Sequence, residues 1–92
     1  DGLVAQSDAQ AAGAMYCLLD QNIPRSRWPK ITGVDNSPIA TDYCAIPLTS
    51  VTAEMETVAE IAVAAIGAKI EGEKTESLLL QPKLVIRQST VA

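Results

Sequence analysis

Residues 3–24, LVAQSDAQAAGAMYCLLDQNIP, contain the clearest structural signals of the chain. The short apolar run Leu3-Val4-Ala5 is typical of a buried strand, and Ser7-Asp8-Ala9-Gln10 has the spacing of a capping box at the start of a helix. The following residues, up to Gln21, are rich in Ala, Leu and Met at helical spacing, and Pro24 blocks continuation of the helix. This stretch therefore predicts a strand that leads directly into a helix.

A second strand is predicted at Ile31-Thr32-Gly33-Val34, followed by the turn cluster Asp35-Asn36-Ser37-Pro38. A strand, a helix and a strand in this order predict a right-handed crossover and parallel strands. Further extended segments are expected at residues 48–51, 77–80 and 84–86, and a long helix is expected between a cap at Thr52 and a terminating Gly72. The predicted fold class is α/β, with a Rossmann-like parallel sheet flanked by helices.

Composition excludes several classes of function. The 92 residues have a net charge of −4, seven Lys and Arg, two cysteines and no histidine. Histidine-dependent triads and imidazole zinc sites are therefore absent, and Cys17 and Cys44 are expected to be free thiols. The few cations are spread along the chain, so the chain itself is not expected to bind DNA. Without a visible signal peptide or membrane span, we expect a cytoplasmic protein. Because the sequence shows no Gly-rich phosphate loop, no nucleophile beside the acids and no metal-ligand cluster, we expect a protein that is not an enzyme and uses no metal or cofactor.

Polar side chains follow the two predicted parallel strands at their carboxyl ends. Gln6, Ser7 and Asp8 follow the first strand, and Asp35 and Asn36 follow the second. Because the carboxyl ends of parallel strands meet at one edge, these residues are expected to form a polar cluster that binds a small polar ligand. The alternatives are that Ser7 or Asp8 only caps the helix, and that Asp35 and Asn36 only form a turn.

Two other side chains also have competing interpretations. Trp28 could stack on a sugar, but its position beside Pro29 favours a loop residue that covers the edge of the core. Arg87, at the end of a strand, could pair with an acid, but a surface salt bridge or a solvated side chain is the favoured expectation.

Four stretches together resemble the carboxyl-terminal part of the effector-binding domain of the lactose and galactose repressor family. They are Ser7-Asp8-Ala9-Gln10-Ala11-Ala12-Gly13-Ala14, Ile31-Thr32-Gly33-Val34-Asp35-Asn36, Pro47-Leu48-Thr49-Ser50-Val51 and Leu84-Val85-Ile86-Arg87-Gln88-Ser89-Thr90. The stretches occur in the family's order with roughly its spacing, and they span nearly the whole chain.

The resemblance implies an incomplete part of a two-lobed periplasmic-binding-protein-like domain. Residues 1–50 and 83–92 would belong to the carboxyl-terminal lobe, and residues 51–82 would contribute to the amino-terminal lobe. It also implies that a small effector, such as a sugar, binds in the cleft between the lobes. In the full protein, a helix-turn-helix headpiece would precede this domain, and a homodimer would bind operator DNA. The chain, which does not begin with methionine, is thus expected to be a fragment.

The resemblance also assigns residues by position. Asp35 matches the family's acidic effector contact, Ser7 stands where an Asn beside the cleft is usual, and Ala53 and Met55 fall at positions that often face the cleft. Asn36 joins them as a member of the polar cluster. The helix from Ala9, with Ala12 and Met15, and the loop near Tyr43 resemble elements that pack across the dimer interface.

These features predict the effector-sensing portion of a transcriptional repressor. One alternative is an extracytoplasmic sugar-binding protein of a transport system, which would have a signal peptide upstream in place of the headpiece. A second alternative is a small α/β enzyme that uses Asp8 and Asp35 as an acid–base pair or to hold Mg²⁺. The wide apolar face of the long second helix is expected to be covered by another chain or by the remainder of the parent protein.

Overall fold

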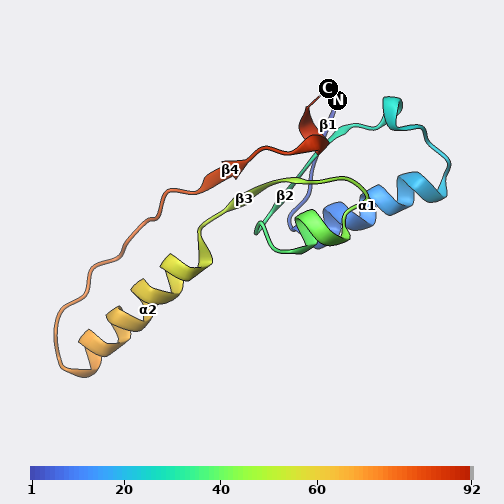
Figure 1. Cartoon of the computed structure of the whole chain (residues 1–92). Helices are drawn as coiled ribbons and strands as arrows, with labels where there is room; N and C mark the ends of the chain where they lie inside the picture. Colours follow the sequence, from blue (N-terminus) through green and yellow to red (C-terminus); the bar gives the residue numbers. More distant parts are fainter. Residues whose placement is uncertain (92) are drawn as a thin grey trace. The chain divides into compact units, whose positions relative to one another are not determined.

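A computed structural model of the chain describes residues 1–91. Its elements are β1 (Gly2–Val4), α1 (Asp8–Asp20), the 3-10 turn η1 (Arg25–Arg27), β2 (Lys30–Val34), the π-helical turn η2 (Ile39–Tyr43), β3 (Thr49–Thr52), α2 (Met55–Ile70), β4 (Lys83–Val85) and the 3-10 turn η3 (Gln88–Thr90) (Figure 1). The chain divides into two compact units. Unit 1 contains residues 1–52 and the residues from 84 onward, and unit 2 contains residues 53–83.

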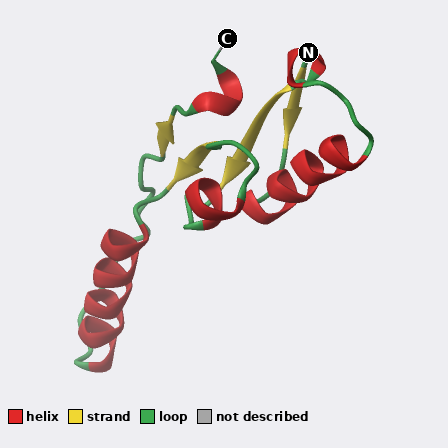
Figure 2. Ribbon diagram, turned by 45° about the vertical axis from the view of Figure 1, so that its right-hand side comes forward, coloured by secondary structure: helices red, strands yellow, loops and turns green. Residues whose placement is uncertain are grey.

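The sheet has the strand order β1-β2-β3-β4. β1 pairs with β2 in parallel, with Leu3 beside Ile31, and β2 pairs with β3 in parallel, with Thr32 beside Thr49. Figure 2 shows the arrows of these three strands pointing in the same direction. The predicted α/β fold with parallel strands is confirmed, and the carboxyl ends of β1, β2 and β3 therefore lie at the same edge.

Helix α1 begins and ends where the sequence predicts, within one residue. The Ser7 hydroxyl accepts a hydrogen bond from the backbone N–H of Gln10 at 3.3 Å, and the Gln10 side chain accepts one from the backbone N–H of Gln6 at 3.2 Å. These bonds satisfy N–H groups that have no partner within the helix. At the other end, Asn22 has a φ of 56°, and Ile23 donates its N–H back to the carbonyl of Leu18.

The core of unit 1 lies between α1, β2 and η2. Met15 of α1, Ile31 of β2 and Leu48 before β3 are fully buried, and Ala11 and Ala40 fill the space between them. Such small residues let the backbones of the helix and the sheet approach each other closely.

Trp28 packs against the edge of this core and is half-buried. Its indole Nε1–H donates to the carbonyl oxygen of Ile23 at 2.8 Å, which satisfies the polar atom of an otherwise apolar ring. The interpretation of Trp28 as a residue that covers the core edge is confirmed.

Gly33 is required by close packing in the middle of the sheet. A Cβ atom at this position would lie 2.6 Å from Oδ1 of Asp8 and 2.8 Å from Cδ2 of Leu48. We expect Gly33→Ala to lower the free energy of unfolding of the intact protein by about 1–3 kcal/mol, as measured by urea denaturation. Gly2→Ala is the matched control, because a Cβ on that strand residue would meet only an ordinary contact at 3.7 Å. Equal effects of the two substitutions would contradict this packing argument.

Helix α2 differs from the sequence-based prediction at its start. Glu54 has a φ of 53°, so the chain turns in the left-handed region there and the helix begins at Met55, without Thr52 as its cap. The carboxyl end agrees with the prediction, because Gly72 has a φ of 81° just beyond the last turn. The extended segment expected at residues 77–80 is not a strand. It pairs with none of the strands that the structure describes.

The described residues bury none of the side chains of α2. Four of its large apolar side chains have between 61% and 80% of their surface exposed; they are Met55, Val63, Ile66 and Ile70. The exposed apolar face agrees with the expectation that other polypeptide covers this helix. Within the part of the chain that the structure describes, no helix combines the length and apolar character that a membrane crossing needs.

Candidate functional site

The carboxyl end of β2 presents two consecutive residues with positive φ angles. Asp35 has a φ of 113° and Asn36 a φ of 54°, and positive φ angles are uncommon outside glycine, with Asn and Asp among the enriched residues. The backbone N–H of Asp35 donates to the carbonyl of Val51 at 2.8 Å, which fixes the start of the turn. The Asp35 side chain is exposed, and its carboxylate has no partner among residues 1–91. The turn therefore presents an acceptor group that is free to bind a ligand.

Arg87 holds this turn from the other end of the chain. Its guanidinium donates to Oδ1 of Asn36 at 2.6 Å and to the carbonyl oxygen of Leu48 at 2.7 Å. The side chain is half-buried, so the expectation of a solvated or surface-paired arginine is wrong. The fork of the guanidinium matches two acceptors at once, which makes Arg87 a positioning residue for Asn36 and the neighbouring Asp35.

Asp8 stands at the centre of a buried hydrogen-bond network below the turn. Its carboxylate accepts from the hydroxyl of Ser50 at 2.6 Å and from the backbone N–H and hydroxyl of Ser37 at 2.7 and 3.1 Å. Ser50 in turn accepts from the backbone N–H of Asn36 at 2.9 Å. With only 1% of its surface exposed, Asp8 is a buried acceptor whose carboxylate is already bonded to Ser37 and Ser50.

Sequence reasoning missed this network. Asp8 was expected to be a helix cap or an edge ligand, but Ser7 caps the helix and Asp8 turns into the protein. The available signal was the presence of two serines, Ser37 just after β2 and Ser50 within β3, beside Gly33. In a parallel sheet, such hydroxyls lie on the same edge as an aspartate that follows the first strand.

Three of the five predicted ligand residues follow strand ends at the same edge of the sheet. Ser7, Asp35 and Asn36 all follow carboxyl ends of β1 and β2 in unit 1, although the Ser7 hydroxyl already accepts from the Gln10 N–H. Ala53 and Met55 are exposed and belong to unit 2.

The predicted dimer-interface residues separate into two groups. Met15 is fully buried in the core and Ala12 retains 8% exposure, because both lie on the inward face of α1. The side chain of Met15 is therefore not available to a partner, which corrects the expectation for this residue. Tyr43 is 64% exposed, and its carbonyl accepts from the hydroxyl of Tyr16, an exposed residue of α1.

Both cysteines are free thiols, as predicted. Burial, together with the nearby negative charge of Asp8, raises the pKa of the Cys44 thiol. Cys44 thus remains protonated at neutral pH and packs as a small apolar group. Within residues 1–91, no three metal-ligating side chains gather in one place.

In open α/β domains, ligands bind outside the carboxyl ends of parallel strands, and this sheet has its polar residues at that edge. Residues 1–90 match the model of the periplasmic binding protein-like domain, and the chain belongs to this family. A comparison with curated proteins gave no match.

Several solved structures are similar to the chain. A LacI-type transcription regulator from Bifidobacterium animalis subsp. lactis is 29% identical with a TM-score of 0.86, over 100% of this chain and 33% of that one. A periplasmic binding protein/LacI transcriptional regulator from Alkaliphilus metalliredigens, complexed with D-xylulofuranose, is 26% identical with a TM-score of 0.89, over 100% of this chain and 35% of that one.

The transcriptional regulator CelR, in complex with cellobiose, is 27% identical with a TM-score of 0.84, over 97% of this chain and 28% of that one. The chain thus spans about a third of the length of these regulators. The resemblance to the effector-binding domain of the lactose and galactose repressor family is confirmed.

Proposed function

We propose that the chain is the effector-sensing portion of a DNA-binding transcriptional repressor, and that it helps to bind a small polar ligand such as a sugar. The observation that carries this proposal is the exposed, unpartnered carboxylate of Asp35, held in a positive-φ turn at the carboxyl end of β2. A carboxylate accepts several hydrogen bonds and suits the hydroxyl groups of a sugar. Two of the similar regulators form complexes with sugars, cellobiose and D-xylulofuranose, which supports this ligand class.

The ligand would bind in the cleft between the two lobes of the parent domain. In this proposal, residues 1–50 and 83–92 belong to the carboxyl-terminal lobe and contribute Asp35, Asn36 and Ser7. Residues 51–82 belong to the amino-terminal lobe and contribute Ala53 and Met55. The remainder of the parent chain would cover the exposed apolar face of α2.

The protein would act as a switch without catalysing a reaction. Closure of the lobes around the effector would change the affinity of a homodimer for its operator, which a headpiece outside this chain would bind in the cytoplasm. Such a switch requires that the effector binds one state more tightly than the other, typically by about 1–3 kcal/mol. The regulators among the similar structures favour this function over delivery of a sugar to a transporter.

A thermal-shift screen of the intact protein tests the proposal. Sugars, polyols and nucleobases are added separately, and a true effector present at 100 times its dissociation constant is expected to stabilise the protein by about 2.7 kcal/mol. The same compound should change the affinity of the protein for its operator. Stabilisation by a sugar without any change in DNA binding would instead support the transport alternative, and the absence of stabilisation by all polar compounds would contradict the ligand class.

A further inference from the structure

Unit 1 has a cavity at the end of the sheet opposite Asp35. Its volume is about 480 Å³, within the range of small-molecule pockets. Lys30, which lines it, is the first residue of β2, Ile46 precedes β3, and Gln88 begins η3. The cavity therefore lies at the amino ends of the strands and is separate from the candidate effector site.

The charge of the lining is opposite to that of the chain. The chain has 11 acidic and 7 basic residues, yet the described lining residues include Arg25 and Lys30 and no acid. The ammonium group of Lys30 donates to the carbonyl oxygen of Thr90 at 3.0 Å. The guanidinium of Arg25 has no hydrogen bond or ion pair within residues 1–91, so it is the cation that remains available for a ligand.

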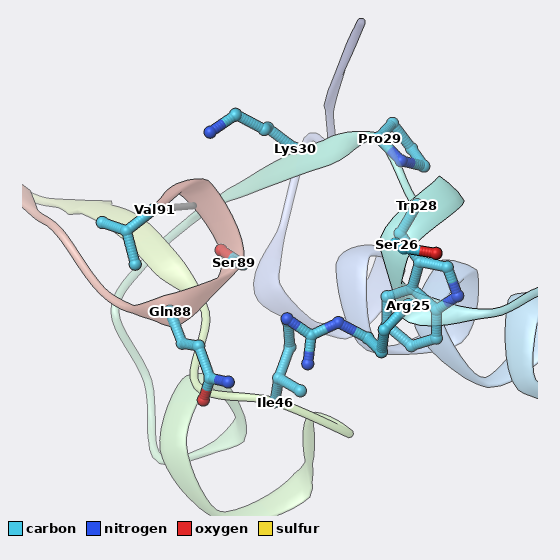
Figure 3. Close-up of a pocket in the computed structure, with 9 residues that line it drawn as sticks. All are labelled: Arg25, Ser26, Trp28, Pro29, Lys30, Ile46, Gln88, Ser89 and Val91. Carbon is cyan, nitrogen blue, oxygen red and sulfur yellow. The ribbon is translucent and has the colours of Figure 1, made fainter.

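Arg25 is held in place by an aromatic ring. Its guanidinium carbon lies 5.3 Å from the centroid of the Trp28 ring, and that ring is itself fixed by the bond to the carbonyl of Ile23. Pro24 and Pro29 flank the segment and restrict its backbone. Figure 3 shows the guanidinium extending from the Trp28 side toward Ile46, with the Gln88 carboxamide across the cavity.

We propose that this cavity binds a small organic anion, whose phosphate or carboxylate group pairs with the guanidinium of Arg25. A guanidinium presents parallel N–H donors that match either group. The Gln88 carboxamide offers a further donor, and Trp28 and Ile46 offer apolar surface for the organic part of the ligand. Because the lining offers apolar surface as well as polar groups, it favours an organic anion over a bare inorganic ion.

Calorimetric titration of the intact protein tests the proposal with glycerol 3-phosphate and succinate as anionic probes and glycerol as the uncharged control. We expect one of the anions, or both, to bind at one site per chain, with an affinity that falls as salt is added. Arg25→Gln is expected to weaken binding about tenfold or more. Arg27→Gln is the matched control, because Arg27 belongs to the same exposed turn but does not line the cavity.

Binding of a single anion would identify the group that the site recognises and would support the proposal. The proposal is overturned if neither anion binds at millimolar concentration, if glycerol binds equally well, or if Arg27→Gln weakens binding as much as Arg25→Gln. Because Asp35→Asn leaves this cavity intact, that variant is expected to bind the anions normally. Failure of the anion site is therefore distinguishable from failure of the proposed effector site.

Discussion

Replacing Asp8 with alanine is expected to lower the free energy of unfolding of the intact protein by about 3–5 kcal/mol. The substitution removes a buried carboxylate that accepts three hydrogen bonds from Ser37 and Ser50. The donors left behind lie in a part-buried or buried environment, where the loss of a partner costs far more than it does at the surface. Urea denaturation followed by circular dichroism measures the effect.

Asp20→Ala provides the matched control, because Asp20 is an exposed acid at the other end of the same helix. Its replacement is expected to change stability by less than about 0.5 kcal/mol. Asp8→Asn keeps the shape of the side chain but replaces one acceptor oxygen with an N–H₂ group, which cannot accept from the neighbouring hydroxyl and amide donors. The stability of the Asp8→Asn variant should therefore lie between that of the alanine variant and that of the unmodified protein. If Asp8→Ala were as stable as Asp20→Ala, the network would not be a main support of unit 1.

The network also connects stability to the candidate ligand site. Ser50 accepts from the backbone N–H of Asn36 and donates to Asp8, while Arg87 binds the side chain of Asn36. Residues from three separate parts of the chain thus fix the turn that follows β2. We infer that weakening this network lets the turn relax from its positive φ angles, since such backbone conformations persist only when surrounding contacts hold them.

Much of unit 1 could be predicted from local sequence signals. Ser7 and Gln10 begin α1 as the capping-box spacing indicates, and Asn22, Ile23 and Pro24 end it. These signals work because each acts within one turn of helix, where sequence neighbours are also neighbours in space. The parallel pairing of β1 and β2 followed from the same local information, since one helix connects the two strands.

The errors concern features that depend on contacts between distant residues. Arg87 was expected at the surface because nothing near it in sequence indicates that Asn36 and Leu48 supply its partners. Met15 was placed at an interface by resemblance, although the helical spacing that put it on one stripe with Ala11 also describes a core face. Glu54 gave no local sign of its left-handed conformation, since glutamate rarely adopts a positive φ.

Asp35 is different, because its position at the end of a strand follows from the sequence. It ends an apolar strand, and the structure leaves its side chain exposed with no partner within the described residues. We expect Asp35→Ala to weaken effector binding by about 100-fold or more, which corresponds to the loss of charge-assisted hydrogen bonds to ligand hydroxyls. The measurement is the dissociation constant of whichever effector the thermal-shift screen identifies, together with the effector concentration needed to change operator binding.

Two further variants separate loss of the ligand contact from a change in the backbone. Asparagine tolerates positive φ as aspartate does, so Asp35→Asn keeps the turn and removes only the charge, whereas alanine is disfavoured at a φ of 113°. If the carboxylate binds the effector, both variants lose affinity while the melting temperature of Asp35→Asn without ligand stays unchanged. Asp42→Asn, on an exposed acid in η2, should leave binding unaffected. Full effector affinity in Asp35→Asn would show that the charge at the end of β2 does not recognise the ligand, because a contact that depends on a carboxylate cannot survive its conversion to a neutral amide at the same position.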